Sequence, residues 1–350
     1  MKICETKTYK YLGIIINRQL TDTDHIKQHL SKKVKKMEGY IRYTLASHMD
    51  INRVNFGMTI WDKVILLSIS HAAPVWFNDT ASNKKALLSF QNECARAILK
   101  LKTMPARMGL LAELGWLPIT DKLDIDRIKY FEHLQKMDNR RLPKVIFNLV
   151  KTTSPTCRYL RNIKNIMEEQ GMDYMFENDE LLNTATFTKA VHDTHKINFH
   201  STIEKYNSLK LFCRLLPESC ISECSPYLRS KSGSFYAKHL KLKMRTGTLG
   251  LGEDLLIQKR GSGLCPLCGA FETVKHFIFT CLHYSSIRKD MYDKLLAYDV
   301  NAFNMFISNF DFATSRVLGS HDNHYNEHFL LFLENAWTLR KMMFLSLHKF

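Results

Sequence analysis

The sequence predicts a mainly α-helical protein that contains one short β-strand near its start. In several long segments, apolar residues recur at every third or fourth position, which is the spacing of one face of an α-helix. A single run, YKYLGIII at Tyr9–Ile16, is instead rich in the β-branched and aromatic residues that favour a strand. The 350 residues suffice for two or three domains and a sizeable core. We therefore expect a helical protein of more than one domain.

The segment after the predicted strand contains the first long helix. Residues 17–24 (NRQLTDTD) are typical of a turn and end in residue types that cap helices. One apolar face then follows through Ile26, Leu30, Val34, Met37, Ile41 and Leu45. Four lysines on the other face are candidate contacts to a phosphate backbone: Lys32, Lys33, Lys35 and Lys36. The same pattern fits an ordinary surface helix that lysine keeps soluble, so both interpretations stay open.

Three further helices are predicted before residue 150. Residues 52–76 are apolar and indicate a buried helix that breaks near Pro74. Residues 85–101 repeat the helical spacing. Another helix begins at Thr120, whose hydroxyl is a typical cap, and carries Asp121 and Asp124 near the positive end of its dipole. This helix is expected to close around Pro143.

The second half of the chain begins with a less regular stretch. We expect residues 151–200 to form a boundary and a loose helical segment, because polar runs interrupt the pattern. Helical spacing returns at 201–216 and at 234–244, and the latter helix ends in a basic stretch. Three residues there are candidate phosphate contacts: Lys241, Lys243 and Arg245. A flexible glycine-rich run follows, and the tail is expected to hold helices at 285–298 and 324–347, the last of them buried.

The most specific motif is LCPLCGAFETVKHFIFTC, which holds three cysteines and a histidine. Their spacing is C-x2-C-x7-H-x4-C, given by Cys265, Cys268, His276 and Cys281. Zinc prefers four tetrahedral thiolate and imidazole ligands, and a closed set of four protein ligands is structural. His283 is a nearby competitor for the fourth position, and the alternative is four unrelated buried residues. The motif therefore predicts a structural Zn²⁺ site.

The charge balance is strongly basic. Fifty Lys and Arg residues against thirty-four Asp and Glu residues leave a net charge of +16. Such an excess favours a polyanionic partner, and an inert basic surface is the alternative. Membrane association is not expected, because the longest apolar stretch, residues 64–77, contains a proline and falls short of the ~20 residues that span a bilayer. RNA or DNA is thus the expected partner.

The cysteine content favours a reducing compartment. Nine cysteines occur in a large chain whose first residues lack the apolar core of a signal peptide. Outside the zinc motif they read as free thiols rather than as a disulfide framework. We therefore expect an intracellular protein of the nucleus or the cytoplasm.

Several motifs occur in an order that resembles the C-terminal region of LINE-type (non-LTR) retrotransposon reverse transcriptases. The resemblance covers nearly the whole chain and is weakest at 151–233. It is carried by Lys10-Tyr11-Leu12-Gly13-Ile14, His25-Ile26, Ala73-Pro74-Val75-Trp76, Glu113-Leu114-Gly115, Arg245-Thr246-Gly247 and the Cys265–Cys281 knuckle. The knuckle is the most specific of these motifs. The resemblance rests mainly on the fact that all of them occur in the same order as in the family.

The resemblance implies a division into four regions. These are a thumb-like helical bundle at 1–150, a helical connector at 151–233, a basic helix plus CCHC zinc knuckle at 234–290 and a helical tail at 291–350. It implies contacts with RNA or DNA, and with a polymerase palm or other retroelement proteins. In the knuckle, Phe271, Phe277 and Phe279 could pack or stack on bases, and packing is favoured for Phe277 and Phe279.

The catalytic part of such a polymerase is not recognisable in this sequence. A palm needs adjacent aspartates that converge on two metal ions, and the sequence has no Asp-Asp pair. We therefore expect no catalytic residues, and expect the strand at Tyr9 to pair with strands upstream of Met1. Two alternatives stay open. One is a zinc-stapled protein-interaction module, and the other is a non-catalytic part of an active reverse transcriptase assembled with another chain.

Overall fold

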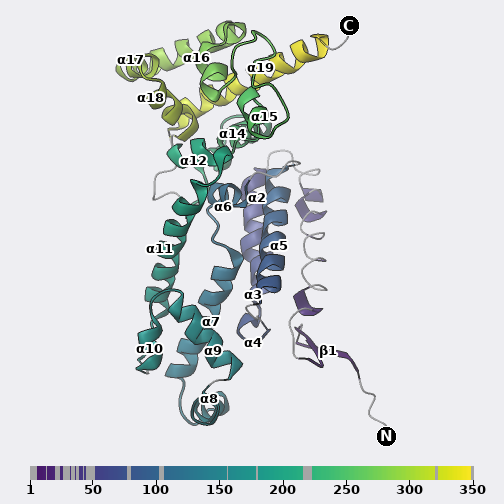
Figure 1. Cartoon of the computed structure of the whole chain (residues 1–350), viewed down its shortest axis with the longest axis vertical. Helices are drawn as coiled ribbons and strands as arrows, with labels where there is room; N and C mark the ends of the chain where they lie inside the picture. The colour runs from purple at the N-terminus through teal and green to yellow at the C-terminus, as the bar shows by residue number, and fades with distance from the viewer. Residues whose placement is uncertain are drawn as a thin grey trace. The chain divides into compact units, whose positions relative to one another are not determined.

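The computed structural model of the chain is mainly helical, which confirms the predicted fold class (Figure 1). It describes residues 6–12, 14–19, 24–26, 32, 36, 39–41, 43–44, 52–76, 80–101, 106–155, 157–178, 180–215, 223–319 and 322–347. The chain forms two compact units. Unit 1 comprises 1–49, 57–97 and 117–198, and unit 2 comprises 50–56, 98–116 and 199–350. Among the described residues, no helix has both the length and the apolar character to cross a bilayer.

The predicted N-terminal strand is a hairpin of two strands. β1 (Thr8–Tyr11) pairs antiparallel with β2 (Ile14–Asn17), with Tyr11 opposite Ile14. Leu12 adopts a left-handed conformation (φ 46°) in the two-residue connection, as tight hairpin turns require. Within the part of the chain that the structure describes, β1 pairs with β2 along one edge, and the expectation that this strand also pairs with strands upstream of Met1 stays a prediction.

The lysine-rich helix is described in part. Residues 24–26, 32, 36, 39–41 and 43–44 are helical, with Ile26 and Ile41 buried, as the apolar spacing predicts. Lys32 and Lys36 are exposed. Lys33 and Lys35, which were expected to share their role, lie outside the described residues.

The buried helix predicted at 52–76 has three consecutive parts and a break. α2 (Arg53–Ile60) passes through the π-helical η1 (Trp61–Ile65) into α3 (Leu66–Ser70). The break comes at Ala72, which has a φ of 54°, two residues before the proline. Pro74 lies in the first turn of α4 (Ala73–Trp76), where its missing N–H leaves no intrahelical bond unmade.

The start of α7 is held by a side chain from another helix. α7 (Ile119–Lys136) begins one residue before the predicted Thr120, and the hydroxyl of Thr120 donates to Asp121 instead of capping the helix. Gln91 of α5 (Ala81–Leu99) accepts from the Ile119 N–H at 2.9 Å and donates to the Leu117 carbonyl at 2.8 Å. One buried amide therefore replaces the expected local cap.

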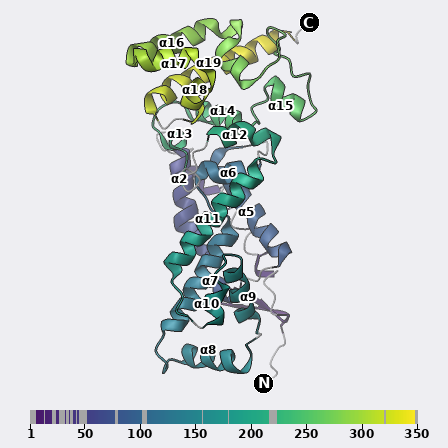
Figure 2. The ribbon, with the colours of Figure 1, turned by 60° about the vertical axis from the view of Figure 1, so that its left-hand side comes forward.

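The region 151–200 is more regular than predicted. α8 (Leu142–Thr153), α9 (Arg158–Glu168), α10 (Asp173–Glu177) and α11 (Thr184–Ile203) follow one another with short connections. α7, α9 and α10 lie side by side (Figures 1 and 2). Apolar residues of α7, α9 and α11 share one core, which includes Ile128, Ile163 and Phe187. Ser154 and Pro155 lie in the connection between α8 and α9, and most of the described region is helical.

Unit 2 is built around the C-terminal helix α19 (Asn323–Leu347). α14 (Phe235–Arg245) and α16 (Ser285–Tyr298) pack against α19 (Figure 1). The predicted helices at 234–244 and 285–298 are therefore confirmed, and Ser234 caps α14 by accepting from the Ala237 N–H at 3.0 Å. The remaining elements are α6 (Arg107–Leu114), η2 (Asn207–Leu209), α12 (Lys210–Leu215), α13 (Pro226–Arg229), α15 (Gly252–Ile257), η4 (His276–Thr280), η5 (Leu282–Tyr284), α17 (Val300–Ser308), α18 (Phe310–Thr314) and η6 (Ser315–Gly319). α15 lies within the run that was expected to be flexible.

Candidate metal centre

The two cysteines of the CxxC pair lie on a tight hairpin. Leu264 and Phe271 form an antiparallel bridge, and the Cys265 N–H donates to the Ala270 carbonyl at 2.7 Å. The turn closes as the Gly269 N–H donates to the Cys265 carbonyl at 2.9 Å. Gly269 has a φ of 75°, a conformation that glycine adopts without steric cost. The local sequence therefore presents both thiols from one turn.

The other two candidate ligands flank a single wide helical turn. His276 opens the π-helical η4, and Cys281 follows its last residue and donates its N–H to the His276 carbonyl at 2.9 Å. Arg288 of α16 fixes this segment by donating to the carbonyls of Ile278 and Cys281 at 2.7 and 2.9 Å. The positions of both candidate ligands are thus set by hydrogen bonds to the backbone of this segment.

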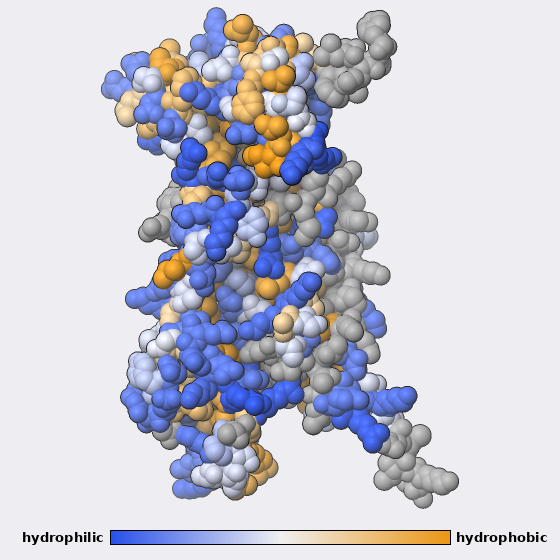
Figure 3. Space-filling view, viewed as in Figure 1, coloured by the Kyte–Doolittle hydropathy of each residue, from blue (hydrophilic) through white to orange (hydrophobic). Residues whose placement is uncertain are grey.

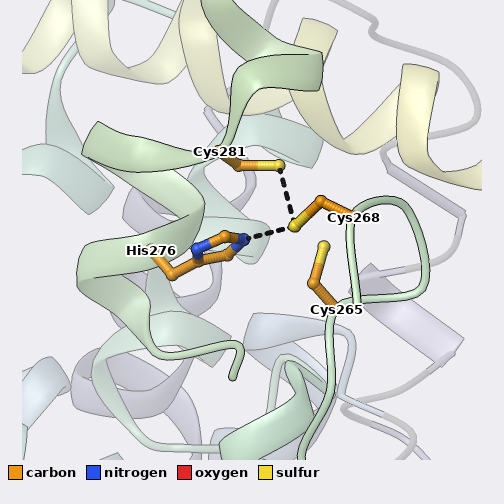
Figure 4. A group of neighbouring side chains, drawn as sticks. All are labelled: Cys265, Cys268, His276 and Cys281. Atoms are coloured by element: carbon orange, nitrogen blue, oxygen red, sulfur yellow. Dashed lines mark hydrogen bonds between the residues drawn. The ribbon is translucent and has the colours of Figure 1, made fainter. Parts of the chain in front are cut away.

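The four side chains converge on one point (Figure 4). The ligand atoms of Cys265, Cys268, His276 and Cys281 all lie within 4.8 Å of one another. Cys268 Sγ lies 3.3 Å from His276 Nε2 and 4.0 Å from Cys281 Sγ. Zinc–sulfur bonds of about 2.3 Å in a tetrahedron place the ligand atoms roughly 3.8 Å apart. The cluster therefore fits a tetrahedral metal ion.

The orientation of the imidazole also suits a metal ligand. Thr280 Oγ1 lies 3.3 Å from His276 Nδ1, so Nε2 is the ring nitrogen that faces the sulfur atoms. A hydrogen-bonding partner on the second ring nitrogen is the usual way in which proteins orient a ligating histidine. His283, the competing candidate, is exposed and is not part of the cluster.

The ionisation of the cluster depends on its burial. Burial raises the pKa of Cys265, raises the pKa of Cys281 to about 12 and lowers the pKa of His276. The lowered pKa favours the neutral, ligating form of the imidazole, while the raised pKa values of Cys265 and Cys281 favour their protonated thiols. Metal ligation needs thiolates, so binding of a divalent cation releases protons from these cysteines.

A buried ion pair ties the knuckle to α19. Glu272 is fully buried, and its carboxylate accepts two bonds from the Arg340 guanidinium, one of them at 2.9 Å. The same carboxylate accepts from the Gly252 N–H at 2.7 Å. A Cβ at Gly252 would lie 2.4 Å from the Gly263 carbonyl oxygen, so glycine is needed where α15 meets the hairpin. The sequence analysis did not predict this role of Glu272. The feature that could have indicated it is the position of Glu272 within the cysteine–histidine motif.

The expected phosphate contacts beside the knuckle need correction. Lys241 has 0% exposure, and its ammonium donates to Asn326 Oδ1 at 2.8 Å and lies 4.8 Å from the centre of the Tyr227 ring. Burial holds its pKa well below the usual range. Arg245 is also buried and donates to the Leu318 carbonyl. Both residues lie on the face of α14 that is packed inward, so neither reaches a phosphate, whereas Lys243 is half-buried on that helix.

Two motifs of the resemblance meet in the same cluster. Arg245 Nε lies 2.5 Å from Glu113 Oε1, and the Tyr227 hydroxyl donates to Glu113 Oε2 at 3.1 Å. The glycine of each motif has a positive φ, 65° at Gly115 and 61° at Gly247. A Cβ at these glycines would approach the backbone of residues 223 and 208 at 2.3 and 2.4 Å. The ELG and RTG motifs therefore build the interior of unit 2.

Comparison with known proteins gives a partial relationship. Over 134 residues the chain is 25% identical to a probable RNA-directed DNA polymerase from transposon X-element of Drosophila melanogaster. The match spans 37% of this chain and 14% of the length of that relative. No family model and no solved structure matches the chain. The chain thus contains a region related to a transposon polymerase.

Proposed function

We propose that the chain is a nucleic-acid-binding, C-terminal part of a non-LTR retrotransposon reverse transcriptase, with a structural zinc ion held by the CCHC knuckle. The observation that carries the proposal is the convergence of the three thiols and the imidazole within 4.8 Å, in a chain with a net charge of +16. The related region of a transposon polymerase supports the same assignment, because an RNA-directed polymerase acts on nucleic acid.

The proposed role of zinc is to fold the knuckle. Four protein ligands complete a tetrahedron, so the ion has no open position for a substrate or a water molecule. When bound, it supplies cross-linking energy to the segment from Cys265 to Cys281, which is short and contains several exposed residues. The chain's own Glu272–Arg340 pair then fixes the folded knuckle on α19.

The proposed nucleic-acid contacts are those basic side chains of the sequence prediction that are not buried. Lys32 and Lys36 are exposed on the first helix, and Lys243 is half-buried on α14. Lys33 and Lys35 belong to the proposal through the sequence pattern. Contacts to phosphates give affinity and salt dependence but little choice of sequence.

Metal content and nucleic-acid binding test this proposal together. The purified chain should contain about one zinc per molecule and should bind labelled RNA or DNA. Its affinity should fall with salt, with a slope of log affinity against log salt of about −0.7 per phosphate contact on a single strand. Cys268→Ser should release the zinc and weaken binding, whereas Cys213→Ser, a half-buried cysteine of α12 outside the cluster, should do neither.

A second candidate function is a zinc-stapled protein-interaction module. It is favoured by the burial of Lys241 and Arg245, which removes two basic side chains from the surface beside the knuckle. Zinc at full occupancy without nucleic-acid binding at low salt would select this candidate. Primer extension tests the remaining alternative, in which the chain is a non-catalytic part of an active reverse transcriptase assembled with another chain. The chain alone should show no primer extension. Synthesis that depends on this chain when another chain supplies a palm would select the alternative.

A further inference from the structure

The knuckle hairpin carries an aromatic side chain on its outer face. Phe277 and Phe279 are buried, as favoured from the sequence, and their rings pack against Tyr284 and Phe306. Phe271 is 48% exposed instead. It lies opposite Leu264 in the antiparallel bridge, and residues directly opposite each other project from the same face of a β-pair. Leu264 is 50% exposed, so the two form one apolar face.

Helix α15 extends this apolar face. A Cβ at Gly263 would lie 2.7 Å from the Phe271 ring and 3.2 Å from a methyl group of Leu256, so both side chains cover the same glycine. Leu256 and the adjacent Ile257 are exposed. Phe271 therefore does not stand alone but lies within a surface that also includes Leu264 and Leu256.

Two basic residues follow α15 after Gln258. Lys259 and Arg260 are exposed, and their backbone N–H groups donate to the carbonyls of Leu256 and Leu255 at 2.9 and 2.8 Å. Two of the acids of this segment, Asp254 and Glu272, are buried and accept bonds from backbone N–H groups, whereas Glu253 of α15 is half-buried. Over α14 and α15, hydrophobic side chains reach the surface beside hydrophilic ones (Figure 3).

We propose that this surface, formed by Phe271, Leu264, Leu256, Lys259 and Arg260, binds the unpaired bases of a single-stranded nucleic acid. Phe271 stacks on a base, and the two cations contact the neighbouring phosphates. Bases in a duplex are stacked on one another and have no free face to offer the ring, so the surface selects single strands. The inference rests on the proposed function and adds the form of nucleic acid that the knuckle recognises.

The test compares the native chain with Phe271→Ala on single-stranded RNA, single-stranded DNA and a duplex of the same sequence. A lost base–aromatic stack should lower single-strand affinity by roughly 5- to 100-fold and leave duplex affinity unchanged. The zinc content should stay at the native value, because Phe271 is not a ligand. Lys259→Glu with Arg260→Glu should weaken binding to both forms.

A second variant reports stacking directly. Phe271→Trp should bind like the native chain, and single strands but not the duplex should quench the fluorescence of the new tryptophan. Tyr174→Trp, an exposed aromatic position on α10, is the control and should show no such quenching. Zinc-dependent binding that is unaffected in Phe271→Ala, with no quenching in Phe271→Trp, would overturn this inference but not the proposed function. A native chain that binds no nucleic acid would overturn both.

Discussion

The carboxylate of Glu113 has a donor on each of its oxygens. Arg245 lies against Oε1, and the Tyr227 hydroxyl donates to Oε2. Glu113 has no exposed surface, so its charge has lost its hydration and depends on these neighbours. The amino group of Lys241 lies against the ring of the same Tyr227, which places a second basic group in this interior cluster.

Removing the guanidinium should therefore be costly. Arg245→Met keeps much of the side-chain volume but leaves a buried carboxylate without its ion-pair partner, and should lower the free energy of unfolding by about 3–5 kcal/mol. Chemical denaturation followed by circular dichroism measures the change. Lys259→Met is the matched control, an exposed cation whose loss should cost at most about 0.5 kcal/mol. If Arg245→Met were as stable as the native chain but bound nucleic acid more weakly, Arg245 would contact phosphate as the sequence predicted.

At the scale of an element, α15 is stabilised at its start by one acid. The Asp254 carboxylate accepts from the N–H groups of Gly250 and Leu251 at 3.0 and 3.2 Å. Burial nevertheless raises its pKa to about 6, because desolvation outweighs the two backbone bonds. The folded chain thus holds this proton more tightly than the unfolded chain. The resulting stability is present below the unfolded pKa near 4 and is lost as the pH rises through 6.

Asp254→Asn should remove this pH dependence. Its amide oxygen can still accept a backbone bond, and it carries no charge to desolvate. Between pH 4 and 7, the free energy of unfolding of the native chain should fall relative to that of the variant by on the order of 2 kcal/mol. Urea denaturation across this pH range measures the difference, with Asp290→Asn, an exposed acid on α16, as the control for loss of charge. A difference that does not change with pH would contradict the assigned burial effect.

At the scale of the whole molecule, the candidate metal site belongs to unit 2. Cys265, Cys281 and Phe277 are members of a core that also contains Phe329 and Phe332 of α19. The core that includes Ile128, Ile163 and Phe187 belongs to unit 1 and has no member from the knuckle. Loss of a metal should therefore affect the two cores unequally.

Chelation tests this expectation. Removing the metal should speed amide hydrogen exchange in α14, α16 and α19 by roughly tenfold or more, because metal binding and folding of the knuckle are linked. Exchange in α7 and α9 should keep its native rate. Mass spectrometry of proteolytic fragments, with and without chelator, gives both rates from one sample. Equal acceleration in both sets of helices would contradict a metal effect confined to unit 2.

The predicted division into four regions, at 1–150, 151–233, 234–290 and 291–350, stays a prediction. What the sequence determined was local. Helical spacing located α14, α16 and α19, and the cysteine spacing selected four candidate ligands whose side chains converge, because both patterns depend on residues close together in the chain.

The tertiary structure decided which faces are buried. A lysine or arginine on a helix is ordinarily exposed, so nothing near Lys241 or Arg245 in the sequence indicated that both point inward. Their partners, Asn326 and Glu113, lie 85 and 132 residues away, and Arg340 lies 68 residues from Glu272. Spacing gives the period of a helix, but only packing against distant segments determines whether its charged side becomes a surface for a ligand or the interior of the fold.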